Sequence, residues 1–319
     1  MPEKTLKEKT AKGLMWGTIS NGAQLVLGTL FGIFLARILS PSDYGMVGLL
    51  TVFSQIASVL QDSGFRTALA NRREIVHEDY NAVFWFNVGT SCVMYLLLFF
   101  LAPLITEFYQ HSDAAANQDL SELTPLARFS FLGFVIASLG TAHYAYLFRT
   151  LQVKQKAIIT VISLTTSSTI GLTMALKGYA YWGLATQGIA FTTCNTILFW
   201  YFSKWRPTLP VSFHPLKEMF GFSSKLLAND ICNNINGNIL SVMLGRFYAV
   251  HDVGLYNQAN KWTSMVSTMV LGTIKDVAQP VLRNVETERE RHKRVFRKML
   301  RFNAFMVFPS PLRISLDFA

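Results

Sequence analysis

Long apolar runs, separated by gaps that alternate between strongly basic and nearly free of basic residues, constrain this chain more than any other feature. Apolar runs of about 20 residues cross a bilayer as helices, and the loops that stay in the cytoplasm retain Lys and Arg. We therefore predict a multi-pass protein of the bacterial inner (plasma) membrane with a cytoplasmic N-terminus. Most basic residues fall in five alternate gaps, at residues 1–13, 66–73, 149–156, 203–225 and 283–301. The opposite gaps hold little beyond Arg37, Lys177 and Arg246.

The apolar runs predict an all-α, polytopic membrane helix bundle. Of the 319 residues, 51% are apolar and only 15% are charged, whereas soluble domains carry about 25% charged residues. No loop between the runs is long enough for a separate soluble domain. The predicted helices lie at about residues 14–36, 44–65, 82–106, 126–147, 157–176, 179–202, 220–247 and 253–282, and a ninth begins near residue 299.

The remaining bulk features exclude several functions. The net charge of +10 lies in short loops, so it indicates membrane topology and attraction to anionic membrane lipids rather than nucleic-acid binding. Cys92, Cys194 and Cys232 lie in apolar runs and form no CxxC pair, so we expect no disulfide and no metal site. We find no nucleotide-binding or catalytic motif. We expect a protein that is not an enzyme and needs no cofactor.

A second copy of the opening of the chain appears when the sequence is shifted by 209 residues. Six predicted helices separate the copies, so both enter the membrane in the same direction. Two such halves are related by an axis along the membrane normal, an arrangement common in transporters. The alternative is chance likeness between apolar helices. The matched pairs are Asn21 with Asp230, Gln24 with Asn233, Gly28 with Gly237, Leu35 with Leu244, Arg37 with Arg246, Asp43 with Asp252 and Gly45 with Gly254.

The repeat divides the chain into two lobes. Residues 1–205 supply a first lobe of six helices, and residues 206–319 supply a partial second lobe with helices seven, eight and an incomplete ninth. A complete second lobe would need six helices, and the last apolar run is interrupted by Pro309 and Pro311. We therefore expect a C-terminally truncated chain. A naturally short end is the alternative.

Polar residues inside the predicted first and seventh helices recur at steps of three or four and so share one face of each helix. Polar groups in the bilayer are costly and normally face a bundle interior or a watery cavity. We predict that this face lines a hydrated substrate path. Hydrogen bonding between helices is the open alternative. The predicted path residues are Asn21, Gln24, Asp230, Asn233 and Asn234.

Four basic residues are candidates for a charged gate or for contacts to a phosphate group. Arg37 and Arg246 end the first and seventh helices, and each precedes an Asp by six residues. Lys261 and Lys275 lie within the predicted eighth helix. The alternatives are loop-closing ion pairs between each Arg and its Asp, and a structural pairing of Lys275 with an acid on a neighbouring helix.

The residues around these positions resemble a known family. Residues 35–45 (LARILSPSDYG), 61–65 (QDSGF), 220–225 (FGFSSK) and 254–260 (GLYNQAN) are similar to bacterial polysaccharide flippases of the Wzx type, within the MOP (MATE-like) exporter superfamily. The resemblance covers about residues 5–308. It implies a MATE-like two-lobe architecture, here with an incomplete second lobe. It also implies alternating access.

The resemblance further implies export of an undecaprenyl-diphosphate-linked oligosaccharide for lipopolysaccharide or exopolysaccharide synthesis, with polysaccharide polymerase or assembly proteins as partners. Three alternatives stay open. One is a drug or metabolite antiporter of the same superfamily. Another is a non-transporting scaffold subunit of a polysaccharide-synthesis complex. The third is a membrane glycosyltransferase.

Overall fold

The computed structural model describes residues 3–62, 65, 69, 75–110, 120–150, 152–209, 212, 214–265 and 297. All regular secondary structure in these residues is helical, as predicted. The chain divides into two compact units, Met1–Leu255 and Tyr256–Ala319. In the second unit, residues 256–265 are helical. The predicted helix from residue 299 and the stretch 266–282 of the predicted eighth helix lie outside the described residues.

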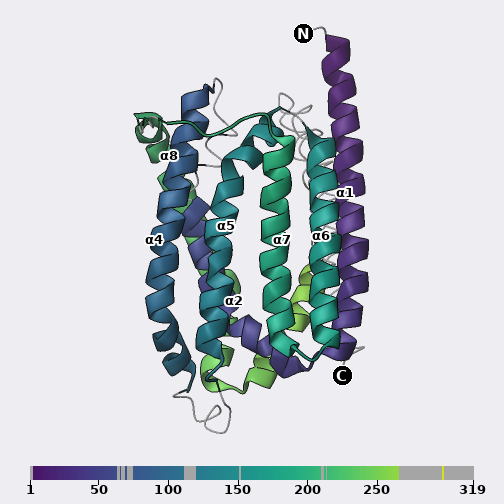
Figure 1. Cartoon of the computed structure of the whole chain (residues 1–319), viewed down its shortest axis with the longest axis vertical. Coiled ribbons are helices and arrows are strands. Elements are labelled where there is room, and N and C mark those ends of the chain that lie inside the picture. Colours follow the sequence, from purple (N-terminus) through teal and green to yellow (C-terminus); the bar gives the residue numbers. More distant parts are fainter. Residues whose placement is uncertain are drawn as a thin grey trace. The chain divides into compact units, whose positions relative to one another are not determined.

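The helices of the first unit follow the predicted order. They are α1 (Glu3–Ile38), α2 (Pro41–Asp62), α4 (His77–Gln110), α5 (Leu123–Arg149), α6 (Val153–Leu176), α7 (Ala180–Phe202) and α8 (His214–Phe247) (Figure 1). A further helix begins at residue 250. The differences are at the ends: α1 begins at Glu3 rather than near residue 14, and α4 is longer at both ends. Lys, Glu and Ala favour helix, so α1 is helical before its apolar run begins.

Five of the described helices are long and apolar enough to cross a membrane. These spans are Ser20–Ile38, Pro41–Leu60, His77–Gln110, Leu123–Arg149 and Val153–Leu176. Length and composition alone do not place α7 and α8 in this group. The apolar character of α8 is diluted by its cluster of Asn residues.

The middle helices pack through small and hydroxyl side chains, which are common at helix interfaces in membranes. A buried hydrogen bond of 2.9 Å joins Ser91 Oγ on α4 to Ser138 Oγ on α5. On the other face of α5, the Oγ1 of Thr196 on α7 donates to the carbonyl oxygen of Ile136 at 3.0 Å. The close approach there is possible because Gly140 has no side chain, and an added Cβ would lie 3.1 Å from Thr196 Oγ1.

The segment after α7 is extended and is tied to the start of α4. Asn81 Nδ2 donates to the carbonyl oxygen of Thr208 at 2.8 Å, and Thr208 N donates to Asn81 Oδ1 at 3.0 Å. The indole nitrogen of Trp85 also donates to the Thr208 carbonyl, at 3.3 Å. Residues 203–209 are therefore held against the first six helices. The predicted lobe boundary between residues 205 and 206 falls in this segment and stays a prediction.

The two copies of the repeat pack on different helices. Helix α1 packs along α6, whereas α8 packs along α2 and α4. Gly245 allows the close approach of α8, since an added Cβ there would lie 2.7 Å from Tyr109 Cε1 on α4. The repeat-equivalent helices α1 and α8 therefore have different neighbours within this unit.

The turns that follow α1 and α8 have the same backbone hydrogen bonds at an offset of 209 residues. Leu39 N donates to Leu35 O, and Tyr248 N donates to Leu244 O. Asp43 N donates to Ser40 O, as Asp252 N does to Ala249 O. The next bond of each turn is also shared, from Tyr44 N to Ser40 O and from Val253 N to Ala249 O. The two turns therefore have the backbone likeness that the predicted repeat requires, and the repeat itself stays a prediction.

Candidate functional site

A polar face lies in the middle of α8, over residues 229–236. Asp230 and Asn233 are exposed, and Asn229 and Asn236 are exposed beside them. Asn234 is half-buried and donates from Nδ2 to the carbonyl oxygen of Asp230 at 2.8 Å, within the same helix. Asn233 makes no side-chain hydrogen bond to the residues that the structure describes. Amide and carboxylate groups are therefore presented outward from α8.

The matching polar face of α1 is also partly exposed. Asn21 is exposed, whereas Gln24 is half-buried and donates from Nε2 to both the carbonyl and hydroxyl oxygens of Ser20, at 3.3 and 3.2 Å. The structure makes no hydrogen bond between these two residues and Asp230 or Asn233. The predicted path residues therefore lie on two helices, α1 and α8. That they line one common path stays a prediction.

Hydrogen bonding between helices explains one α8 amide. Asn238 Nδ2 donates to Oε1 of Gln55 on α2 at 2.7 Å, and also to the carbonyl oxygen of Asn234 at 2.8 Å. Gln55 was not among the predicted site residues, because a lone amide in an apolar helix gives no indication of its partner. Asp230 and Asn233 make no such bond to a described residue, so the alternative accounts for only part of the polar face.

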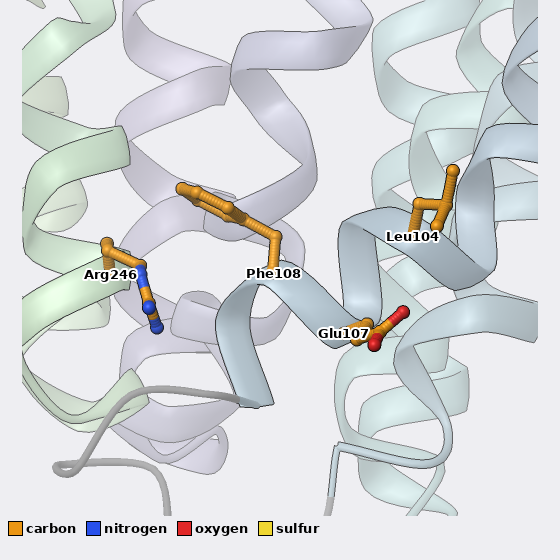
Figure 2. A pocket seen from close by; sticks show the side chains of 4 residues that line it. All are labelled: Leu104, Glu107, Phe108 and Arg246. Atoms are coloured by element: carbon orange, nitrogen blue, oxygen red, sulfur yellow. The ribbon is translucent and has the colours of Figure 1, made fainter.

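Arg246 lies in an open pocket between the ends of α8 and α4, with a volume of about 450 Å³ (Figure 2). Leu104, Glu107 and Phe108 line it with Arg246. The guanidinium carbon lies 5.4 Å from the centroid of the Phe108 ring, which indicates a cation–π contact. Arg246 Nη1 is buried without a hydrogen-bond partner among the described residues. Figure 2 shows the Glu107 carboxylate pointing away from Arg246.

The repeat-equivalent Arg37 is exposed at the end of α1. The sequence left open an ion pair between Arg37 and Asp43, but Asp43 has a different role. Asp43 Oδ2 accepts hydrogen bonds from the backbone nitrogen and hydroxyl of Ser40 at 2.8 and 2.7 Å, and Asp43 N lies 3.3 Å from Ser40 Oγ. This is a capping box at the start of α2. The Arg37 guanidinium is therefore not held by Asp43.

Of the two lysines of the predicted charged gate, only Lys261 lies among the described residues. Lys261 is an exposed residue of the helical stretch in the second unit. Lys275 lies outside the described residues. Among the residues that the structure describes, no group of three or more His, Cys, Asp or Glu side chains could hold a metal ion.

Comparison with known proteins identifies the chain's relatives. A family model described as "Polysaccharide biosynthesis protein" matches residues 34–315. The chain is 28% identical over 316 residues to the lipopolysaccharide biosynthesis protein WzxC of Escherichia coli (strain K12), covering 97% of this chain and 61% of WzxC. It is 26% identical over 314 residues to the succinoglycan biosynthesis transport protein ExoT of Rhizobium meliloti (strain 1021), covering 98% of this chain and 61% of ExoT. The chain thus spans about three fifths of the length of these relatives.

Among solved structures, the fold is similar to that of an inward-facing multidrug-resistance MATE family transporter of the MOP superfamily. The TM-score is 0.62 at 18% identity, and the match covers 89% of this chain and 68% of that transporter. This likeness concerns the fold alone.

Proposed function

The chain belongs to the polysaccharide biosynthesis protein family and has the helical fold of MATE transporters, and from this premise we propose that it exports a lipid-linked oligosaccharide across the bacterial inner membrane. The proposed substrate is an oligosaccharide on undecaprenyl diphosphate, destined for lipopolysaccharide or exopolysaccharide. The names of two relatives describe WzxC as a lipopolysaccharide biosynthesis protein and ExoT as a succinoglycan biosynthesis transport protein. They support the proposal for this chain.

The observation that carries the proposal is the outward-facing polar face of α8. A helix that faces lipid on all sides would not expose Asp230, Asn233 and Asn236, because charged and amide groups are costly in hydrocarbon. An aqueous path removes this cost. Amide groups both donate and accept hydrogen bonds, and a carboxylate accepts them. These groups suit the many hydroxyls of a sugar chain.

The diphosphate of the substrate requires cationic groups instead. Arg246 offers a buried Nη1 that has no hydrogen-bond partner within the described part of the chain, and it lies in an open pocket. Arg37 is exposed at the equivalent helix end. Arginine is well suited to phosphate because its planar donors bind two oxygens at once. We propose that Arg37, Arg246, Lys261 and Lys275 contact the head group at different stages of its passage.

A flipping assay in proteoliposomes tests the proposal. Vesicles containing the purified chain and a fluorescent undecaprenyl-diphosphate oligosaccharide should show faster loss of lectin-accessible glycan than protein-free vesicles. Asn233→Leu should slow this loss several-fold. Thr165→Leu is the matched control, since Thr165 is an exposed polar residue on α6 that bonds only its own helix at the Val161 carbonyl.

The outcomes separate the remaining functions. Equal flipping with and without the inserted chain would overturn the transport proposal. Copurification of polymerase or assembly proteins in that case would identify a scaffold subunit. Efflux of small cationic dyes without flipping would favour the drug antiporter.

A further inference from the structure

Gly45 and Gly254 make a reciprocal contact near the start of two helices. An added Cβ at Gly45 would overlap the carbonyl oxygen of Val250, and an added Cβ at Gly254 would overlap the carbonyl oxygen of Pro41. The offset of 209 residues converts Gly45 into Gly254 and Pro41 into Val250. Each copy of the repeat therefore presents the same two positions to the other copy. This is an isologous contact, in which one surface pairs with its own equivalent.

The contact is between main chains. A Cβ on Gly254 would lie 2.7 Å from the carbonyl carbon of Pro41 and 3.0 Å from the backbone nitrogen of Gly45. A Cβ on Gly45 would lie 2.8 Å from the carbonyl carbon of Val250. Small residues permit such approaches between membrane helices. The described helices also contain glycines with nothing within 4 Å of an added Cβ, such as Gly22, Gly89 and Gly237, so the crowding is specific to the contact.

The contact lies at one end of the polar faces. On α8, Asn233 precedes Phe247 by 14 residues, which is about 21 Å along a helix. The two helices that carry the polar faces, α1 and α8, pack on different neighbours. The copies therefore meet tightly at their turns, while Asn21 and Asn233 remain exposed further along. The charge pattern predicts that the turns lie on the outer side of the membrane.

We propose that the Gly45–Gly254 crossing is the outer gate of the path, closed in this arrangement and separated when the path opens outward. This inference rests on the proposed function, because it takes the polar faces as the path. It adds to that function the specific residues that seal one end. Any side chain at either glycine would hold the two helix starts apart and favour the open arrangement.

Spin labels on the two sides of the crossing test the gate. Ser42 and His251 are repeat-equivalent and exposed, so both accept a label on a cysteine introduced into a chain with Cys92, Cys194 and Cys232 replaced by Ala. We expect a short distance between the labels in nanodiscs. Gly45→Leu and Gly254→Leu should each lengthen it by several ångströms. Gly89→Leu is the matched control and should leave it unchanged, because its added carbons enter open space.

A smaller substitution keeps the test decisive if the leucine variants fold poorly. Gly45→Ala adds only the overlapping carbon, and it should produce part of the same lengthening. Label distances in Gly45→Ala and Gly254→Ala equal to those of the parent would overturn the gate. The distance measurement needs no substrate. Lengthened distances in the glycine variants, together with no flipping by the parent chain, would retain the contact and reject the transport function. Normal flipping by the parent chain, together with unchanged distances in the variants, would reject the gate alone.

Discussion

Asn238 on α8 and Gln55 on α2 are joined by a side-chain hydrogen bond of 2.7 Å between Nδ2 and Oε1. The two residues are 183 positions apart, and both are half-buried. This bond fixes the second copy of the repeat to a helix of the first copy. The bond is therefore a second link between the two copies, in addition to the contact at their turns.

We predict that Asn238→Leu destabilises the first unit through loss of this bond. Hydrogen bonds between membrane helices contribute about 0.6 kcal/mol on average, with a maximum of about 1.7 kcal/mol. The free energy of unfolding in detergent should fall by an amount in this range, and Gln55→Leu should lower it similarly. Asn236→Leu is the control, since Asn236 is exposed on the same helix. Equal losses for Asn236→Leu and Asn238→Leu would contradict the assignment.

The native cysteines report on the polar face without any added residue. Cys232 is exposed on α8 on the same side as Asn229 and Asn236, whereas Cys92 is exposed on α4 next to the apolar, exposed Val93. The cysteine thiolate attacks the reagent, and a charged reagent reaches the cysteine only through water. A charged methanethiosulfonate should therefore modify Cys232 faster than Cys92. Mass spectrometry of Cys194→Ala protein gives both rates, and equal inertness would contradict an aqueous path beside α8.

Asn81→Ala should release the segment after α7. The variant loses both hydrogen bonds to the main chain of Thr208, and each such bond contributes about 0.5–1.5 kcal/mol. Amide hydrogen exchange in residues 203–209 should therefore accelerate by about tenfold. Asn195→Ala is the matched control, because Asn195 Nδ2 bonds only the Phe191 carbonyl of its own helix, at 3.1 Å. Unchanged exchange in Asn81→Ala would show that the segment is held by other contacts.

Reporter fusions check the predicted topology. The charge pattern predicts that Asp113 lies outside and that Arg291 lies inside, together with the N-terminus. A phosphatase reporter at Asp113 should be active, and a fluorescent reporter that requires the cytoplasm should work at Arg291. Activity of the same reporter at both positions would overturn the orientation. The outer position of the glycine crossing would fall with it.

The lysines can be tested by the flipping assay. If Lys261 or Lys275 contacts the diphosphate, at least one of Lys261→Gln and Lys275→Gln should slow flipping severalfold, because a charge that compensates the head group is lost. Lys177→Gln is the control, since Lys177 is an exposed residue after α6. Normal flipping in both variants at normal protein levels would exclude both contacts. A parallel fall in protein level would favour a structural pairing.

Helix positions could be predicted well because they depend on local properties of the chain. An apolar run of membrane length has few alternatives to a helix, so α5, α6 and α7 lie close to their predicted ranges. The helical start of α1 at Glu3 was missed because polar residues give no apolar signal. The role of Asp43 was also missed. Its spacing from Arg37 suggested an ion pair, whereas the nearer Ser40 provides the cap.

Contacts between segments that are far apart in the chain could not be predicted from the sequence. The repeat shows that Gly45 and Gly254 are equivalent, but equivalence does not imply contact, which also requires that the two copies meet at these positions. The pairing of Arg246 with Phe108 likewise depends on how α8 packs against α4. The polar face of α8 could be predicted from helical spacing alone, because its members lie on one helix.

The atoms that meet at the glycine crossing are peptide atoms on both sides. Peptide groups neither gain nor lose a proton in the physiological pH range. A proton gradient therefore does not act directly on the atoms that touch at the crossing. An ion shifts an equilibrium only as far as it prefers one of the two arrangements. A driving proton would therefore have to act on ionisable groups elsewhere, such as the exposed carboxylate of Asp230. The seal and the energy supply of such an exporter would then be located in separate parts of the molecule.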